Sequence, residues 1–222
     1  MKKFLLISFV VATTGIFVSA FTTIDRKSTD PKPKTANGET TVNGEKKVNT
    51  TWKLDKNHST LRFTVTHMVV SEAEGTFKKW DGTVEHTKED FSDAKISFTA
   101  DVNSINTENE NRDKHLKSDD FFNAEKYPEI KFVSTSFVPA GDKKYKLNGN
   151  LTIRDVTKPV VFDVTYGGIL KGSRGNKAGF KATTTIDRFD YNLKWDRATE
   201  AGSLVVSKEV EITVKLEFDE VK

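Results

Sequence analysis

Few side chains in this chain are of types that carry out chemistry. The 222 residues include four histidines and no cysteine. The histidines are His58, His67, His86 and His115. A catalytic zinc site needs three converging protein ligands and one open position, and acid-base catalysis needs a histidine beside the substrate. The absence of cysteine excludes thiol catalysis, cysteine zinc sites and disulfides.

The spacing of the histidines argues against a shared metal ion. His58 and His67 lie on or near one expected strand, where nine residues at about 3.3 Å each place them about 30 Å apart. His67 and His115 are distant in sequence and could still meet through the fold. We predict no metal site. We expect His67 to point inward and to bond a neighbour or the polar end of a ligand, because a buried imidazole needs a partner.

A second cluster of reactive types, Asp55, His58 and Ser59, invites comparison with a hydrolase. However, the chain contains no G-x-S-x-G motif, and nothing places the serine on a sharp turn between a strand and a helix. Aspartate and asparagine side chains commonly cap backbone groups in turns. We therefore favour a turn and predict no catalytic residue. The basic, glycine-rich run at 171–177 lacks the context of a phosphate-binding loop and is interpreted as a hairpin turn.

The elements that must position these side chains are mostly strands. Apolar and polar residues alternate in three long runs, which is typical of strands with one buried face. The buried faces are predicted to carry Leu61, Phe63, Val65, His67 and Val69; Ala94, Ile96, Phe98, Ala100 and Val102; and Val210, Ile212, Val214, Leu216 and Phe218. Further strands are predicted at 76–86, 129–138, 144–154, 159–169 and 178–187.

These runs predict an all-β fold, namely an extended eight-stranded antiparallel barrel with one short α-helix. Closure of the sheet removes exposed strand edges. One strand over 58–70 would span about 44 Å at about 3.4 Å per residue, which predicts a tall barrel. Eight strands leave an interior that side chains fill or that holds one small ligand. The height of the barrel and the apolar lining of its interior together predict a long, thin, hydrophobic ligand.

One segment is predicted to be helical. Thr107 and Glu110 have capping-box spacing, and Pro128 ends the helical option. We expect a short helix across one end of the sheet, with Leu116, Phe121 and Phe122 packed inward.

The amino-terminal residues differ in character from the rest. Residues 1–20 combine two lysines, an apolar run and small residues at their end, which predicts a secretory signal peptide; an uncleaved anchor is the alternative. Residues 21–50 are polar and are predicted to be a flexible linker before a barrel at 51–222. The formal charge of +3 falls to +1 without Lys2 and Lys3, a balance that argues against nucleic acid as a partner.

One motif extends through the first predicted strand. The run W-x-L-D-x-x-H-S-x-L-x-F-x-V-x-H starts at Trp52 and ends at His67. It is followed, in order, by SEAEGTFKKWDG, SINT, RDKHLKSDDFFNAEKYPEIKF and GNLTIRDVTKPV. Over about residues 51 to 218 the chain resembles the YceI-like family of bacterial exported proteins.

This resemblance implies a lipocalin-like barrel that binds a polyisoprenoid, an isoprenoid quinone or a similar long-chain lipid. It also implies a periplasmic, noncatalytic carrier or storage role, with a homodimer as one possible state. Two residues depart from the family pattern, since Asp155 and Tyr191 stand where glycine is common. If those positions need positive φ, aspartate tolerates it and tyrosine is strained.

Alternation assigns the residues expected to contact the guest. The predicted ligand-binding residues are Leu61, Phe63, Val65, His67, Ile96, Phe98, Phe132, Leu151, Phe162, Val164, Phe180, Ile212 and Val214. Two other functions remain open. One is an enzyme acting on an exported lipid or quinone, with His67 or His115 as base. The other is a structural or adhesive module, which requires a filled barrel without a cavity.

Overall fold

The fold is described by a computed structural model, which covers residues 49–198, 202 and 204–221. The predicted signal peptide at 1–20 and all but the end of the predicted linker at 21–50 lie outside the described residues. Strand β1 begins at Thr50, one residue before the predicted start of the barrel. Among the described residues, no helix has both the length and the apolar character needed to cross a bilayer.

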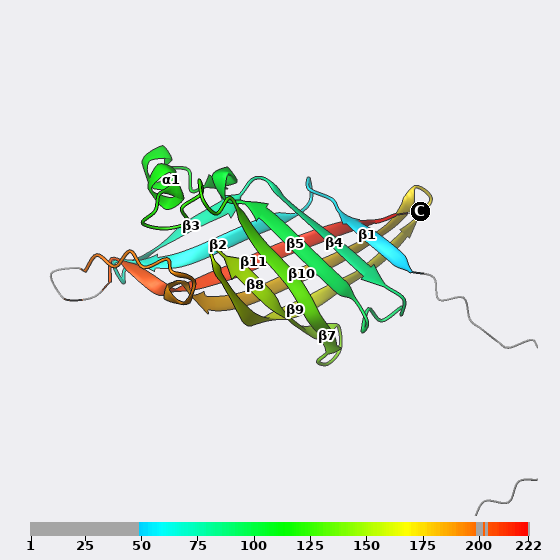
Figure 1. Ribbon diagram of the computed structural model, residues 1–222. Coiled ribbons are helices and arrows are strands. Elements are labelled where there is room, and N and C mark those ends of the chain that lie inside the picture. The colour runs from blue at the N-terminus through cyan, green and yellow to red at the C-terminus, as the bar shows by residue number, and fades with distance from the viewer. Residues whose placement is uncertain (1–48, 199–201, 203, 222) are drawn as a thin grey trace, which may run out of the picture. The chain divides into compact units, whose positions relative to one another are not determined.

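Strands make up most of the described chain (Figure 1). They are β1 (Thr50–Leu54), β2 (Thr60–His67), β3 (Ser71–Phe77), β4 (Trp80–His86), β5 (Lys95–Asp101), β6 (Ile105–Asn106), β7 (Glu129–Pro139), β8 (Lys144–Ile153), β9 (Val156–Gly172), β10 (Gly175–Asp187) and β11 (Val206–Val221). The helical elements are η1 (Val102–Ser104), α1 (Glu110–Lys117) and η2 (Arg188–Tyr191).

Eight of the strands close into a ring. Their hydrogen-bonded order is β1, β4, β5, β7, β8, β9, β10 and β11, and β11 pairs again with β1. Every pairing in this ring is antiparallel. The predicted all-β class and eight-stranded antiparallel barrel with a short helix are therefore confirmed.

The long strand β11 joins the ring to a separate hairpin. Its final residues, Phe218–Val221, pair with β1, whereas Val206 and residues 210–215 pair with β2. Strand β3 then pairs with β2, and the two residues of β6 pair with β3. The hairpin β2–β3 thus extends the wall at one end of the barrel, beside α1 (Figure 1).

Two predicted strand boundaries are wrong. The predicted strand over 58–70 ends at His67, because Met68 and Val69 have φ of 50° and 66° and reverse the chain into β3. Val69 therefore lies in a turn and not on the buried face. The predicted strand over 76–86 is interrupted between Phe77 and Trp80. The long strands are instead β9, β10 and β11, with 17, 13 and 16 residues.

The start of α1 also differs from the prediction. Asn109 caps the helix, and its side-chain oxygen accepts the backbone N–H of Arg112 at 3.0 Å. Thr107 donates its hydroxyl to Asp113 at 2.6 Å and accepts Arg112 Nε at 2.8 Å. Thr107 therefore ties the first turns of the helix to the chain before it and does not cap them.

One end of the barrel is filled by aromatic rings. Phe91 and Phe180 lie 5.4 Å apart edge to face, and Phe180 packs in the same way on Phe218 at 6.2 Å. His86 is buried beside them; its Nε2 accepts Trp52 Nε1 at 2.7 Å, and its Nδ1 donates to the Lys88 carbonyl at 2.7 Å. Both ring nitrogens of this histidine are satisfied by the protein itself. This end is a packed core.

Candidate functional site: an apolar cavity

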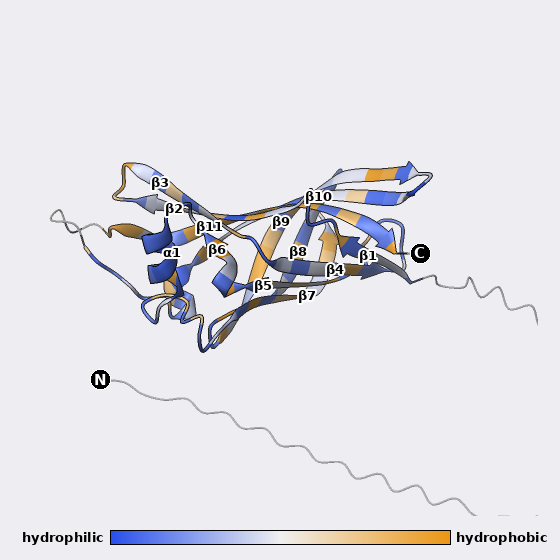
Figure 2. Cartoon of the chain, turned by 90° about the horizontal axis from the view of Figure 1, so that it is seen from above, coloured by the Kyte–Doolittle hydropathy of each residue, from blue (hydrophilic) through white to orange (hydrophobic). Residues whose placement is uncertain are grey.

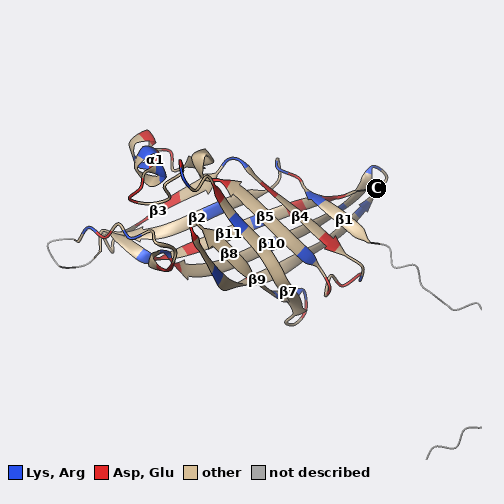
Figure 3. Cartoon of the chain, in the orientation of Figure 1, with Lys and Arg blue, Asp and Glu red and all other residues tan. Residues whose placement is uncertain are grey.

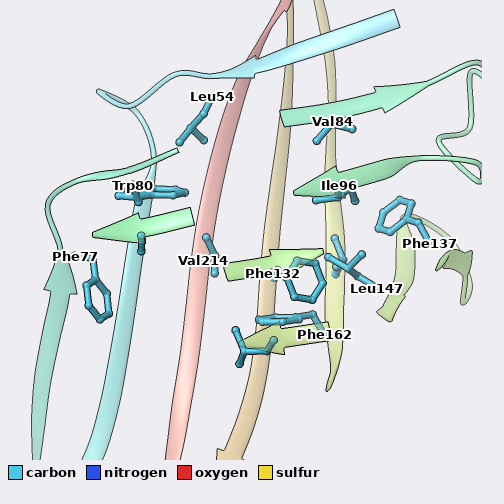
Figure 4. Packing of buried hydrophobic residues seen from close by; sticks show 14 of the residues in the cluster. Leu54, Phe77, Trp80, Val84, Ile96, Phe132, Phe137, Leu147, Phe162 and Val214 are labelled. Carbon is cyan, nitrogen blue, oxygen red and sulfur yellow. The ribbon is translucent and has the colours of Figure 1, made fainter. Parts of the chain in front are cut away.

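A cavity of about 360 Å³ occupies the barrel end that carries α1, β2 and β3. Its wall is formed mainly by aliphatic and aromatic side chains. On its wall, Phe132 and Phe162 pack edge to face with ring centroids 5.4 Å apart, and Val214 lies beside Phe132 (Figure 4). A pocket of this size, lined in this manner, is typical of small-molecule sites. The structural-module hypothesis requires a barrel that is filled along its whole length. The cavity therefore argues against this hypothesis.

Most of the predicted ligand-binding residues lie on this wall. They are Leu61, Phe63, Val65, His67, Phe98, Phe132, Leu151, Phe162, Ile212 and Val214. Ile96, Val164 and Phe180 do not line the cavity and were wrongly assigned to it; they pack with Phe91 and Phe137 in the filled end. Alternation predicts that a side chain points inward, but it carries no information on depth along the barrel axis.

Two glycines make room for the aromatic rings of the wall. A Cβ on Gly75 would lie 2.3 Å from Phe63 Cζ, and a Cβ on Gly82 would lie 2.1 Å from Phe98 Cε1. The rings therefore lie directly over the backbone of the neighbouring strands. Phe63 and Phe98 point into the barrel and yet are only partly buried, because each faces the open cavity.

Polar side chains gather where the helix meets the cavity. Arg112 donates to Thr107 through Nε and through a terminal nitrogen, at 2.8 Å and 2.7 Å, and so stands fixed on the wall. His115 Nε2 bonds Asp120 at 2.8 Å, and its ring meets Trp195 edge-on at 5.5 Å. His67 lies on the same wall, at the end of β2. The cavity thus combines an apolar interior with several hydrogen-bond donors.

Arg188 is a cavity residue that sequence patterns did not identify. It is only 3 % exposed, and Nε and both terminal nitrogens donate to the carbonyls of Ser207, Leu193 and Val206. Burial lowers the pKa of its guanidinium, against the opposing effect of Asp187 and Asp196. The sequence shows only an arginine after a strand, a position usually exposed to solvent.

The two residues that depart from the family pattern are not strained. Positive φ occurs at Arg154 (54°) and Asn192 (60°), and not at Asp155 or Tyr191. Tyr191 is instead a core residue, 2 % exposed, and burial raises the pKa of its hydroxyl to about 12. The one local difference that follows from these two residues is that the ring of Tyr191 adds packing to the core.

The cluster around Asp55 is an ion-pair network at the place where β1 and β11 close the barrel. We call it the seam network. Lys177 Nζ lies 3.0 Å from Asp55, 2.9 Å from Glu217 and 2.7 Å from Asp219. Among the described residues, Asp55, His58 and Glu217 form the one group of three or more that could converge on a metal ion, and none of them lines the cavity. The ammonium of Lys177 already lies within ion-pair distance of Asp55 and Glu217. The arrangement therefore favours an ion-pair network over a metal site.

Ser59 has a different role from that of a nucleophile. Its hydroxyl oxygen accepts the backbone N–H of Glu217 at 2.8 Å, and Asp55 accepts the N–H of Asn57 at 3.0 Å and His58 Nδ1 at 2.9 Å. These bonds fix the turn between β1 and β2 against β11. The interpretation of the motif as a turn agrees with this geometry.

The seam network predicts a pH-dependent contribution to stability. Hydrogen bonds from His58 and Lys177 hold the pKa of Asp55 well below its usual value of 3.8. A depressed folded-state pKa stabilises the fold above the unfolded pKa and loses this contribution as the pH falls. Asp55→Asn is therefore expected to lower the free energy of unfolding most at pH 7, and by a smaller amount at pH 2, because the contribution shrinks below pH 3.8 and is lost only as the pH falls through the folded-state pKa. Urea denaturation of both proteins at pH 7, 4 and 2 measures the difference; a constant difference across this range would contradict it.

Comparison with known proteins decides the family. The model of the YceI-like domain matches residues 52–218. The chain belongs to the YceI-like family. The match begins on β1 and ends on β11, the two strands that close the barrel, where Leu54 pairs with Phe218.

Relatives and solved structures match about three quarters of the chain. A UPF0312 protein of Staphylococcus aureus (strain MSSA476) is 36 % identical over 171 residues, which cover 76 % of this chain and 97 % of the relative. The crystal structure of Burkholderia cenocepacia BcnA is 26 % identical, with a TM-score of 0.64 and coverage of 74 % and 98 %. A polyisoprenoid binding domain from Saccharophagus degradans shares the fold at 18 % identity, with a TM-score of 0.58 and coverage of 76 % and 97 %.

Proposed function

We propose that this YceI-like protein is a noncatalytic carrier or storage protein for a polyisoprenoid, an isoprenoid quinone or a similar long-chain lipid. The observation that carries the proposal is the apolar cavity, which is lined by side chains from most of the barrel strands and ends at the aromatic core. The Saccharophagus degradans domain of the same fold is described as polyisoprenoid binding, which supports a prenyl guest.

Hydrophobic burial provides a reason for such a cavity. Each buried methylene is worth about 0.8 kcal/mol, so a long prenyl chain in water carries a cost of tens of kcal/mol in order of magnitude. A carrier in an aqueous compartment has to shield this surface. The cavity wall is formed mainly by aromatic and aliphatic side chains, which can shield it.

The head of the guest is assigned to the polar part of the wall. Arg112, which has five N–H groups and uses two on Thr107, and His67 offer hydrogen-bond donors beside the apolar interior. A quinone carbonyl, a hydroxyl or a phosphate accepts such bonds, whereas the chain behind it needs only apolar contact. The guest is therefore placed with its head toward α1 and its tail among Phe98, Phe132 and Phe162.

Export to the periplasm belongs to the same proposal. The apolar run and small residues within 1–20 support it, and they predict a mature chain that begins near residue 21. Cell fractionation with determination of the amino-terminal residue tests this directly. If the protein is found in the membrane fraction with residues 1–20 retained, it is an anchored protein and the proposal of a free periplasmic carrier is wrong.

The cavity itself is tested by native mass spectrometry of the purified protein, followed by organic extraction and lipid identification. We expect one prenyl or other long-chain lipid per chain, and the same spectrum gives the number of protomers. A protein that is empty after purification and also fails to take up added prenyl lipids would overturn the proposal.

A further inference from the structure

The turn between β2 and β3 exposes three consecutive apolar side chains. Met68, Val69 and Val70 are 49 %, 71 % and 87 % exposed. Figure 2 colours this turn as hydrophobic, at the end of the hairpin. Single exposed apolar residues are common on protein surfaces, but three in a row at the tip of a hairpin need an explanation.

The backbone makes this choice of residues more unusual. Met68 and Val69 have φ of 50° and 66°, in the left-handed region where glycine, asparagine and aspartate are favoured. A valine is strained there because its β-branched side chain crowds the backbone. A polar turn would relieve both the strain and the exposure. Apolar residues at these positions are therefore contrary to the residue preferences of an exposed turn with positive φ.

The tip lies at the mouth of the cavity. His67, the residue before it, lines the cavity, as do Val205, whose carbonyl accepts the N–H of Met68 at 2.8 Å, and Val206, which pairs with His67. The exposed apolar surface is thus continuous with the apolar wall inside. The opposite end of the barrel carries the aromatic core and the C-terminal end of β11 (Figure 1).

We propose that Met68, Val69 and Val70 form a docking tip that inserts into the surface of a lipid bilayer and brings the cavity mouth to the membrane. This inference rests on the proposed function, because a lipid guest has to pass between a bilayer and the cavity. The N–H groups of Met68 and Val70 are already bonded to carbonyls of Val205 and His67, and such pairing permits backbone to enter an apolar phase.

The charges beside the tip specify the kind of membrane contact. Lys194, Asp196 and Arg197 are exposed in the segment that precedes β11, and Glu72 is exposed in β3, two residues after Val70. Figure 3 shows both basic and acidic segments at this end of the barrel. Positive and negative charges are therefore mixed, and anionic lipid headgroups gain little from this surface. The docking tip is accordingly expected to bind zwitterionic phosphatidylcholine vesicles through apolar contact, with weak dependence on salt.

Site-specific labelling tests the insertion. The chain has no cysteine, so Val70→Cys and Leu170→Cys each create one labelling site. Leu170 is the matched control, since it is 68 % exposed in the hairpin β9–β10 away from the cavity. A nitrobenzoxadiazole fluorophore at position 70 is expected to shift its emission to the blue with phosphatidylcholine vesicles, and the same fluorophore at position 170 is not. Equal responses at both positions would overturn the docking tip.

Lipid transfer provides the second test. The variant Met68→Ser, Val69→Asn and Val70→Thr removes the apolar surface and gives position 69 a residue that accepts positive φ. Its rate of uptake of dansyl-labelled geranylgeraniol from phosphatidylcholine vesicles is expected to fall about ten-fold, while its affinity for the same probe in solution stays unchanged. Ile169→Thr with Leu170→Asn is the matched control and is expected to retain both.

The two measurements separate the two proposals. If the wild-type protein does not bind the dansyl probe in solution, the lipid-binding function is wrong. If it binds the probe but the docking-tip variant takes it from vesicles at the wild-type rate, the function stands and the docking tip is wrong.

Discussion

Replacement of Phe63 and Phe98 together by aspartate is expected to weaken binding of a prenyl lipid by about 100-fold or more. Both rings face the open cavity, on β2 and on β5, so the two carboxylates would sit in the wall that the apolar chain contacts. An apolar guest would then have to desolvate two charges. The measurement is titration of the purified variant with a fluorescent prenyl alcohol, together with lipid extraction from the purified protein.

Two control variants isolate the cause of this loss. Val133→Asp with Val161→Asp adds the same charges on the outside of the barrel, where these side chains are 58 % and 47 % exposed, and is expected to bind normally. Phe63→Leu with Phe98→Leu removes the rings but keeps the wall apolar, and is expected to lose less than about ten-fold. A folded aspartate double variant that still retains lipid would refute the assignment of the wall.

Replacement of Arg188 by methionine is expected to lower the free energy of unfolding by about 3 kcal/mol or more. The change removes the Arg188 donors from the buried carbonyl of Leu193 and the partly buried carbonyls of Val206 and Ser207, and a buried, unpaired carbonyl costs about 1–3 kcal/mol. Leu193 and Val206 also line the cavity, so bound lipid is expected to dissociate faster. Urea denaturation and lipid off-rates measure the two effects.

Arg62 provides the comparison for this substitution. It pairs with Glu74 at 2.8 Å, and both side chains are about half exposed. An exposed ion pair contributes about 0–1 kcal/mol, so Arg62→Met is expected to cost no more than this. If Arg188→Met and Arg62→Met destabilise the protein equally, the carbonyl bonds of Arg188 do not hold the wall together.

Strand alternation predicted the barrel because the physical rule behind it is local. Successive side chains of a strand point to opposite faces, so the apolar series ending in Phe218 and the series containing Phe98 identify inward positions without knowledge of their partners. Most of the residues that the same rule assigned to the cavity wall lie on it. It failed at Val69, because a β-branched apolar residue in a turn opposes every local turn preference.

The other failures concern properties that depend on distant parts of the chain. Ile96, Val164 and Phe180 point inward as predicted, but rings from other strands fill the space around them. Arg188 becomes a buried donor only because Leu193, Val206 and Ser207 turn their carbonyls toward it. Thr107 was predicted to cap the helix, but its hydroxyl is bonded to Asp113 and Arg112, and Asn109 is the cap. None of these relations has a fixed spacing in sequence.

The shared strand β11 also ties barrel closure to the order in which the chain is made. It is the last strand of the described residues, and it pairs with β10, with β1 and with β2. Until its residues are available, those three strands keep open edges and the ring cannot close. Contacts between the first and last strands are slow to form because a long loop has to be closed first. A nascent chain that lacks β11 therefore cannot close its barrel or shield the inner faces of β10 and β1.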